Sequence, residues 1–356
     1  MATNTKTGVY VVGDLLKINN VNISEFGEDT VADVLRRDLA FFNQRVVEML
    51  GQIAEPITTL TKRISRYGTS VKSDMVEADE FGQPTAQRAK PGVNVGWPLR
   101  KYVYAVGWTR DYMLNQTPAD AAISATSAQS AYLERLHEEL RKAVFFSANY
   151  SFVDRFVDEL SLPVKRWVNA DGAEIPDGPN GESFDGATHT HFLFSGSLTN
   201  AAMVALIDTV TEHGHTRGVR LYINKGQETT MRGLTDFEPY VDPRVTFRAT
   251  DTAARTLDLS NSGNRAIGIF KEAEVWVKPW VPSNYQFCFA LGSGRPLKFR
   301  QHHVSQVRGL RIAFEMDDYP LRANELEAYF GFGAWERTNG AANFSNGGSY
   351  TDPTIT

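Results

Sequence analysis

Histidine is the residue type in this chain that comes closest to a chemical pattern. Six of the seven histidines fall in close pairs, which are His189/His191, His213/His215 and His302/His303, and His137 stands alone. Residues two apart on a strand point to the same face, so His189 and His191 can present two imidazoles to one metal ion. Glu212 or Asp185 can add a carboxylate.

The spacing of these histidines matches no common metal-binding motif. The sequence has no His-Glu-x-x-His helix and no cysteine pair at ligand spacing. The adjacent His302 and His303 would point to opposite faces of a strand. We therefore expect surface or interface histidines, with no metal site and no cofactor. A metal-dependent enzyme that uses the histidine pairs stays as an alternative.

Other nucleophiles and acids give no catalytic constellation. Cys288, the only cysteine, lies in the apolar run YQFCFALG, which predicts a buried thiol, and a chain with one cysteine suits a reducing compartment. Glu138 and Glu139 are neighbours on a helix, and Glu138 pairs with Lys142 four residues later. Phosphate-binding loops and the Gly-x-Ser-x-Gly elbow are absent from the sequence. We expect no catalytic residues and no enzyme.

Composition excludes further classes of function. The chain has 356 residues, 42% of them hydrophobic, and a net charge of −5, which does not fit a basic nucleic-acid-binding domain. It has neither a signal sequence pattern at its start nor an apolar run of the ~18 residues that a membrane span needs. The composition favours a folded protein without membrane partners.

Residues 93–108, VNVGWPLRKYVYAVGW, show alternating apolar side chains whose phase changes in the middle. The apolar residues Trp97 and Leu99 occupy odd-numbered positions, whereas Tyr102, Tyr104 and Trp108 occupy even-numbered positions. This pattern predicts one long strand whose apolar face switches near residues 100–101. At ~3.3 Å per residue it spans on the order of 50 Å, longer than one domain needs.

Residues 57–110 are predicted to form a long two-stranded ribbon with a charged tip. An isolated ribbon is marginal in water, so we expect neighbouring subunits to order it. Large aromatic side chains and charges of both signs suit such a contact, because charge complementarity fixes register. The predicted subunit-interface residues are Arg63, Arg66, Lys72, Glu77, Asp79, Glu80, Arg88, Lys90, Trp97, Arg100, Lys101, Tyr102, Tyr104 and Trp108.

The rest of the chain divides into an arm, two long helices and an α/β unit. Apolar spacing of three, four and seven predicts helices over 29–50 and 118–146, the second with Thr117 as its cap. A helix over 199–213 with Gly214 as its stop, followed by strands, predicts an α/β unit. Residues 1–28 read as an extended arm, 147–197 as irregular chain with an insertion at 165–190, and 345–356 as a loose tail.

The ending of the chain is a glycine-punctuated aromatic segment, which we read as one strand. It runs Tyr329-Phe330-Gly331-Phe332-Gly333-Ala334-Trp335, followed by Arg337-Thr338-Asn339-Gly340-Ala341. This ending and the order of arm, ribbon, long helix and α/β unit resemble the tailed-bacteriophage major capsid proteins of the Hong Kong 97 fold. The resemblance implies an α+β capsid fold with an N-terminal arm, an extended β-ribbon loop, a peripheral domain with a long spine helix, and an axial α/β domain.

On that resemblance the expected boundaries cover the whole chain. They are 1–56 for the arm and first helix, 57–110 for the extended loop, 111–197 for the peripheral domain with spine helix and insertion, 198–292 for the axial domain, 293–344 for the return to the peripheral domain, and 345–356 for a flexible tail. Some relatives join subunits through a Lys–Asn isopeptide bond. Lys72 or Lys90 could supply the amine, but no matching Asn and Glu can be assigned, so non-covalent contacts are expected.

The resemblance also implies the function and the partners. The chain would assemble with itself into hexamers and pentamers of an icosahedral head, formed in the host cytoplasm, that encloses double-stranded DNA without sequence-specific binding. A separate scaffold protein, a portal and a decoration protein are the other expected partners. An encapsulin-type compartment, which shares the fold and encloses protein cargo, is the second interpretation.

Overall fold

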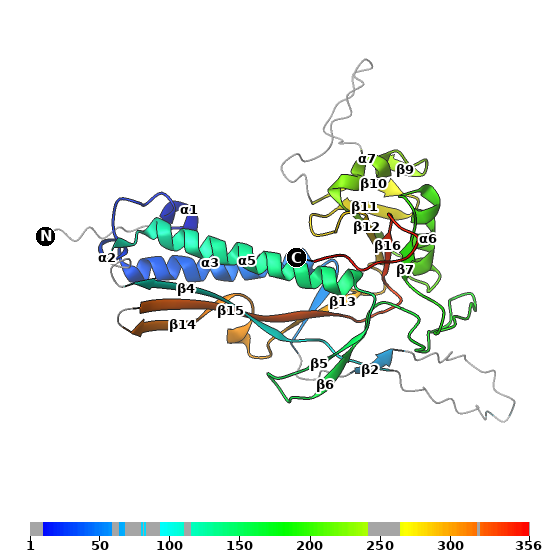
Figure 1. Ribbon diagram of the computed structural model, residues 1–356, viewed down its shortest axis with the longest axis horizontal. Coiled ribbons are helices and arrows are strands. Elements are labelled where there is room, and N and C mark those ends of the chain that lie inside the picture. The colour runs from blue at the N-terminus through cyan, green and yellow to red at the C-terminus, as the bar shows by residue number, and fades with distance from the viewer. Residues whose placement is uncertain are drawn as a thin grey trace, which may run out of the picture.

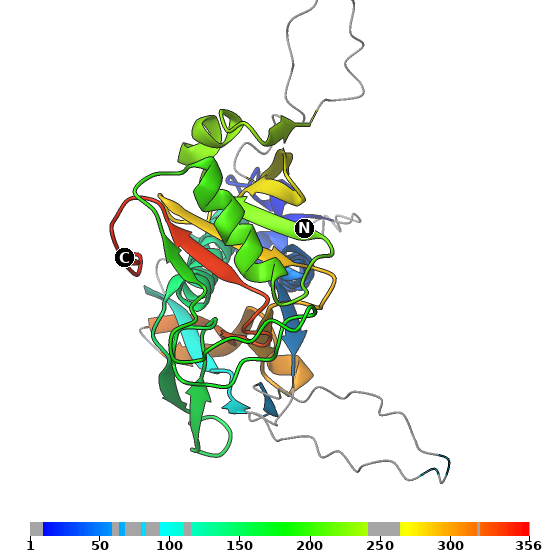
Figure 2. The ribbon, with the colours of Figure 1, turned by 90° about the vertical axis from the view of Figure 1, so that its right-hand side faces the viewer.

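Two regions of different shape make up the protein (Figure 1). The computed structural model describes residues 10–58, 64–67, 80, 82, 93–109, 115–240, 264–318 and 321–355, with some strand residues described by backbone alone. One region is elongated and contains two long helices beside a narrow sheet. The other is an α/β unit with a larger sheet, seen end-on in Figure 2.

The two long predicted helices are confirmed as α3 (Glu28–Leu50) and α5 (Pro118–Phe145), which lie side by side (Figure 1). The start of α5 is a capping box, in which the Thr117 hydroxyl accepts a hydrogen bond from the Asp120 amide and the Asp120 carboxylate accepts one from the Thr117 amide. The apolar faces meet through ring contacts such as Phe42 on Tyr132, at 5.8 Å between centroids.

The described part of the N-terminal segment packs on its own chain, which corrects the expectation of an extended arm. Residues 10–27 form two short helices, α1 (Val12–Leu15) and α2 (Ile23–Phe26). Leu15 is fully buried in a small cluster with Val31 and Val34 of α3 and Ala122 of α5. These apolar side chains find partners inside the chain, so no neighbour is needed to cover them.

A five-stranded sheet, counted over the described residues, lies under the helices (Figure 1). Its longest strand, β15 (Leu321–Ala334), pairs with all but one of the others; the members are β1 (Ala54–Ile57), β13 (Leu297–Gln301), β14 (Arg311–Asp318) and β4 (Arg100–Thr109). Phe330 of β15 contacts Tyr102 at 4.7 Å and Tyr132 of α5 at 5.3 Å between ring centroids. The sheet is therefore held against α5 by aromatic side chains in tilted and edge-to-face contact.

The prediction of a single strand over 93–108 is wrong. β3 (Val93–Val95) pairs with β2 (Ile64–Tyr67), the chain leaves the strand at Gly96–Leu99, and β4 pairs with β15 of the same chain. Pro98 has no amide hydrogen to donate to a ladder, which favours a break here. The change of phase in the sequence therefore marks a move between two sheets. Only the base of the predicted ribbon, β2 with β3, lies within the described residues.

The α/β unit has a seven-stranded sheet within the described part of the chain. In spatial order the strands are β7 (Phe192–Phe194), β16 (Ala341–Phe344), β12 (Tyr285–Ala290), β8 (Val219–Ile223), β11 (Ala273–Val277), β10 (Arg265–Phe270) and β9 (Phe237–Pro239). The helix α6 (Asn200–Thr211) packs over β12 and β16 (Figure 2). Shorter helices follow β8: η1 (Lys225–Gln227) and α7 (Glu228–Arg232).

Two strands of this sheet fall outside the expected axial range of 198–292. β7 precedes that range and β16 follows it, so the aromatic ending is not one strand: β15 ends at Ala334 and a turn carries the chain into β16 of the other sheet. Central strand β12 is buried on both faces. Phe287 and Phe289 join the core shared with α5, while Cys288 joins the core under α6, as expected for a buried thiol.

Two further segments differ from the expectations. A β-hairpin of β5 (Tyr150–Val153) and β6 (Ser161–Val164) occupies part of the range read as irregular. The tail is docked, because the Tyr350 hydroxyl donates to the Phe145 carbonyl at 2.7 Å and Asp352 accepts from the Ser147 amide at 3.0 Å. A short 3-10 helix, η3 (Ser305–Val307), completes the elements. Among the described helices, none is long and apolar enough to cross a membrane.

Candidate functional site

Several predicted interface residues lie outside the described part of the chain. Those that lie outside the described residues are Arg63, Lys72, Glu77, Asp79, Arg88 and Lys90; Arg66 and Trp108 are described only as members of β2 and β4, and Glu80 is exposed. The ribbon tip as a contact surface therefore stays a prediction.

The aromatic side chains that can be placed pack inside their own chain. Trp97 is 1% exposed, its ring lies 5.6 Å from that of Trp335, and its carbonyl accepts a hydrogen bond from Arg300. Because almost no area remains for a partner, Trp97 is a core residue, which corrects its assignment to an interface. Tyr102 and Tyr104 are half-buried against the core shared with α5.

The two basic candidates of β4 are exposed but also contact their own chain. Lys101 forms an ion pair with Glu327 of β15 at 2.7 Å, and the Arg100 guanidinium lies 5.4 Å from the centroid of the Phe152 ring. The hydrogen bond to Glu327 raises the pKa of Lys101 above its ordinary value. Both charges therefore already have partners within the subunit. The tip of the β5–β6 hairpin is a stronger candidate for a contact with another subunit.

That hairpin tip exposes a group of large apolar side chains that sequence reasoning missed. Val153, Phe156 and Leu160 are 47%, 44% and 49% exposed within eight consecutive residues. The tip is held in place by a buried ion pair, Asp154 with Arg300 of β13, at 2.7 Å. Exposed apolar groups on a fixed protrusion are typical of protein contacts. The segment VDRFVDEL, apolar residues among charges in a predicted loop, was the available indication in the sequence.

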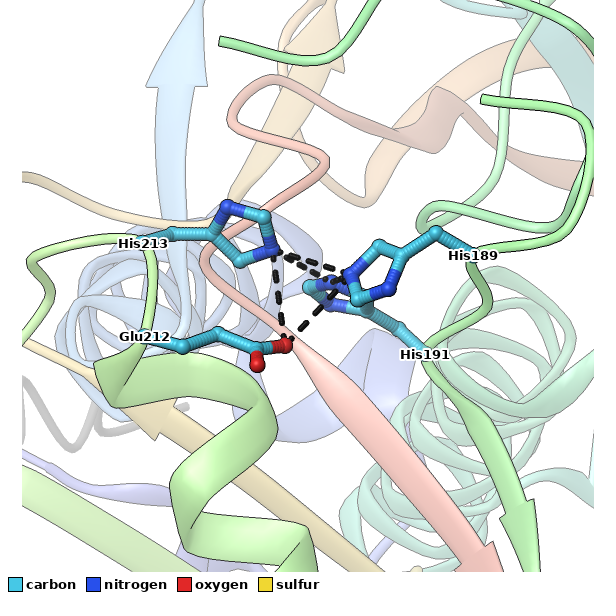
Figure 3. Close-up of side chains that lie close together, drawn as sticks. All are labelled: His189, His191, Glu212 and His213. Carbon is cyan, nitrogen blue, oxygen red and sulfur yellow. Dashed lines mark hydrogen bonds and ion pairs between the residues drawn. The ribbon is translucent and has the colours of Figure 1, made fainter. Parts of the chain in front are cut away.

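Three histidines and a glutamate meet at the edge of the α/β unit (Figure 3). The Nε2 atoms of His189, His191 and His213 form a triangle with sides of 3.1, 3.1 and 3.2 Å. The Glu212 Oε1 atom lies 3.4 Å from the Nε2 of His189 and 3.8 Å from that of His213. We call these four residues the histidine cluster.

Two segments supply the four residues of the histidine cluster, and a third segment contacts one of them. His189 and His191 precede β7, with His191 paired through its Nδ1 to the Gly340 carbonyl at 2.8 Å, just before β16. Glu212 and His213 follow α6, where Gly214 at φ +85° turns the chain as predicted for a helix stop. The cluster thus joins the end of the 165–190 insertion and the adjacent His191 to the end of α6, and His191 contacts the turn before β16.

The pKa values of the three imidazoles are lowered, which favours their neutral form. Burial lowers the pKa of His189, and burial together with its histidine neighbours lowers the pKa of His213 to about 3. Burial, followed by the nearby His213, also lowers the pKa of His191 well below its ordinary value, despite the hydrogen bond to Gly340. Neutral imidazoles keep a ring-nitrogen lone pair free to bind a proton donor or a metal ion.

The expectation that the histidines lie at the surface or at an interface is wrong for two of them. His191 and His215 are buried, at 0% and 9% exposed. Both ring nitrogens of His215 are engaged, Nδ1 with Ser293 at 2.8 Å and Nε2 with Thr338 at 2.9 Å. His302 and His303 follow β13 and stack on each other at 4.4 Å, contrary to the expected opposite orientation.

Asp185, the other carboxylate considered, is not part of the histidine cluster. It caps a turn of the insertion, where it accepts hydrogen bonds from the Ala187 amide at 3.0 Å and the Thr188 hydroxyl at 3.0 Å. The sequence indicated the members of the cluster as candidate ligands, because they fall in short-range pairs. It could not select which pairs meet.

The chain resembles structures from phage particles. No protein-family model matches the sequence, and no curated protein matches it. A chain in the structure of Mycobacterium phage Patience superposes with a TM-score of 0.65 at 19% identity, covering 99% of this chain and 97% of that one. This chain has a Hong Kong 97-type capsid fold.

Two other capsid structures match at lower similarity. The cyanophage A-1(L) capsid gives a TM-score of 0.49 at 13% identity over 84% of this chain and 92% of that one. The capsid of the native GTA particle gives 0.48 at 12% identity over 83% and 89%. The α+β class predicted from the sequence is confirmed, because the described part of the chain contains both helices and mostly antiparallel sheets.

Proposed function

We propose that this chain is a major capsid protein, a shell subunit that assembles with copies of itself into hexamers and pentamers of an icosahedral head. The observation that carries the proposal is the superposition over nearly the full length of both chains with a protein of Mycobacterium phage Patience. A likeness that covers 99% of this chain and 97% of the other supports a shared architecture better than a likeness of one domain would.

The arrangement of the described elements supports a subunit made for lateral contacts. We assign α3, α5 and the five-stranded sheet to the peripheral domain, with α5 as the spine helix, and the seven-stranded sheet with α6 to the axial domain. The β2–β3 pair is the base of the extended loop. Each contact with a neighbour need be only moderate, because a subunit in a shell touches several others at once.

The remaining partners follow from the same proposal. Double-stranded DNA would be enclosed without sequence-specific binding, which suits a net charge of −5, since DNA phosphates attract basic surfaces. A scaffold, a portal and a decoration protein are the proposed accessory partners, and the virion, after assembly in the host cytoplasm, is the proposed location. The role is structural, without catalysis.

Electron microscopy and sedimentation of the purified full chain test the proposal. We expect closed particles with hexameric and pentameric units, either alone or after addition of the phage scaffold protein. A chain that stays monomeric at every concentration, with and without scaffold, would contradict it. Mass spectrometry of purified particles separates the encapsulin interpretation, which requires a co-purifying protein cargo inside the shell.

The hairpin tip provides a matched variant for the same experiment. Leu160→Asp places a charge on the exposed apolar tip without touching the core. We expect folded subunits that assemble poorly. As a control, His303→Ala alters another exposed position in the same half and should assemble normally.

A further inference from the structure

We propose that the histidine cluster is a zinc site, with one metal ion bound by His189, His191, His213 and Glu212. The proposal rests on geometry and on the chemistry of the four side chains, and it is independent of the shell function. Imidazole nitrogen and carboxylate oxygen are ligands that Zn²⁺ accepts in proteins. The ion would join two segments of the chain, residues 189–191 and residues 212–213 (Figure 3).

The distances between the donor atoms match a tetrahedral coordination shell. With zinc–nitrogen bonds of about 2.0–2.1 Å, neighbouring ligand atoms of a tetrahedron lie roughly 3.3–3.4 Å apart. The three Nε2–Nε2 distances are 3.1, 3.1 and 3.2 Å, and the Nε2–Oε1 distances to His189 and His213 are 3.4 and 3.8 Å. All four donor atoms lie within 4.8 Å of one another. Shifts of a few tenths of an ångström bring the three nitrogens to the tetrahedral spacing, and a larger movement of the Glu212 carboxylate towards them completes the site.

Hydrogen bonding among the imidazoles does not account for the triangle. The Nδ1 of His191 lies 2.8 Å from the Gly340 carbonyl, so this nitrogen donates and the neutral ring presents only a lone pair at Nε2. Two N–H groups at most then remain for three close Nε2 pairs. One pair is left without a linear hydrogen bond, whereas a cation at the centre satisfies all three nitrogens.

The surroundings of the cluster are those of a built metal site. The bond from His191 to the Gly340 carbonyl fixes the ring orientation, as outer partners of zinc-bound histidines commonly do. The Phe184 ring covers His189 and His213, at 4.9 and 4.2 Å between centroids. Side chains of His189 and Glu212 are 20% and 35% exposed, which leaves an entry path from solvent.

The number of ligands makes the site structural. Four protein donors fill a tetrahedral shell, while catalytic zinc sites keep one position for water. The metal would fasten the end of the insertion at 165–190 to the residues that follow α6, and His191 contacts the turn before β16 through its hydrogen bond to Gly340. The insertion has few apolar side chains of its own, Ile175 and Phe184 among them, so a metal bond contributes where a core cannot.

Metal analysis and cobalt substitution of the full chain test the site directly. After exchange against Zn²⁺ and gel filtration, we expect about one zinc per chain by mass spectrometry of the metals. Replacement by Co²⁺ should give the intense visible absorption of tetrahedral cobalt. Zinc content near zero, or a cobalt spectrum typical of six oxygen ligands, would overturn the proposal.

Two variants show whether the named residues are the ligands. His189→Ala and Glu212→Gln alter the partly exposed members, so the fold should survive, which circular dichroism checks. We expect each to weaken zinc binding by more than about tenfold in competition with a chromogenic chelator. The matched control is His303→Ala, an exposed histidine outside the cluster. Equal zinc affinity in all three variants would exclude the cluster as the site.

Limited proteolysis gives a readout independent of metal content. If the ion fastens the insertion, zinc should slow cleavage between residues 170 and 188 in the natural chain by several-fold, and a chelator should restore it. For His189→Ala, zinc should not change the rate of cleavage. Cleavage in the natural chain that ignores zinc would contradict the fastening role.

Discussion

The elongated half and the α/β unit differ in how completely they cover their apolar side chains. In the described α/β unit, Phe194, Tyr240 and Ile269 are the large apolar residues that stand exposed, and β12 is buried on both faces. The elongated half exposes many more, on α1, α3, α5, β4 and the β5–β6 hairpin: Val11, Leu16, Phe41, Met49, Val103, Ile123, Val153, Phe156 and Leu160.

This difference indicates which half depends on neighbours. A helix or strand with water on one side normally carries polar residues there, and repeated exposed apolar groups mark contact surfaces. The sheet of the α/β unit is covered within the subunit, with α6 on one face and the end of α5, from the elongated half, on the other. The elongated half is therefore the region we expect to gain most from assembly.

The largest expected effect is the loss of the buried ion pair under the hairpin tip. Arg300→Ala leaves the Asp154 carboxylate buried, with both side chains at most 2% exposed in the natural chain. We expect the free energy of unfolding to fall by about 3–5 kcal/mol, measured by urea denaturation. Arg36→Ala, which breaks an exposed pair with Asp33, should change it by no more than about 0.5 kcal/mol. Similar losses in both would contradict the difference in burial.

Core truncation in the α/β unit should come next. Leu206→Ala removes a side chain of α6 that is 0% exposed, and we expect a loss of about 2–5 kcal/mol. In the elongated half, Ile123→Ala on α5 removes a side chain that is 54% exposed, and the loss should stay near 0.5 kcal/mol. Thermal and urea unfolding of both variants measure the contrast. An equal cost would mean that Ile123 is buried in the free subunit.

A smaller, pH-dependent effect is expected where the insertion meets the turn before β16. Burial works to raise the pKa of Asp171, but Lys165 and Arg337 lower it to about 2, below the ordinary 3.8. A depressed folded-state pKa stabilises the protein above pH 4, and this contribution is lost as the pH falls towards 2. It amounts to at most about 2 kcal/mol, less after screening by solvent.

Asp171→Asn checks this contribution. The variant should be less stable than the natural chain at pH 7, and the difference should shrink between pH 4 and 2 in urea denaturation. Asp33→Asn, at an exposed position, is the control and should follow the natural chain. A gap between Asp171→Asn and the natural chain that is constant over this range would contradict the assignment.

The smallest effect on stability, with the clearest effect on assembly, is expected at exposed apolar sites. Leu160→Asp on the hairpin and Ile269→Asp on β10 should each change the free energy of unfolding by no more than about 0.5 kcal/mol. Burial of a leucine at a contact is worth about 1.5–3 kcal/mol, so Leu160→Asp should weaken assembly at least tenfold. Ile269→Asp should assemble normally; the reverse ranking in sedimentation would refute the comparison.

Local patterns predicted the helices and most strands of the α/β unit. Thr117, Asp120 and the apolar stripe placed α5 to within one residue, and Thr199 and Gly214 placed the limits of α6 to within two residues. Caps and periodicity act within a few residues, so the sequence carries them directly. The hairpin of β5 and β6 was missed because its charged tip resembles an ordinary loop.

The histidine cluster shows where prediction from sequence stops. His189 and His191 share a face by spacing alone, and Glu212 and His213 are adjacent, so the pairs were visible as candidates. The choice of partner was not, because the His189–His213 contact spans 24 residues and the His191–Gly340 contact spans 149. His215, equally good by type, is occupied by Ser293 and Thr338.

The sequence by itself determined the local elements, the buried thiol of Cys288 and the α+β class, since residue periodicity and caps report which face of an element avoids water. Only the tertiary structure decided that residues 93–109 divide between two sheets, that Trp97 is a core residue and that β16 lies between β7 and β12. Strand pairing and side-chain clusters depend on contacts between distant residues, and a period of two does not encode which partner a strand will meet.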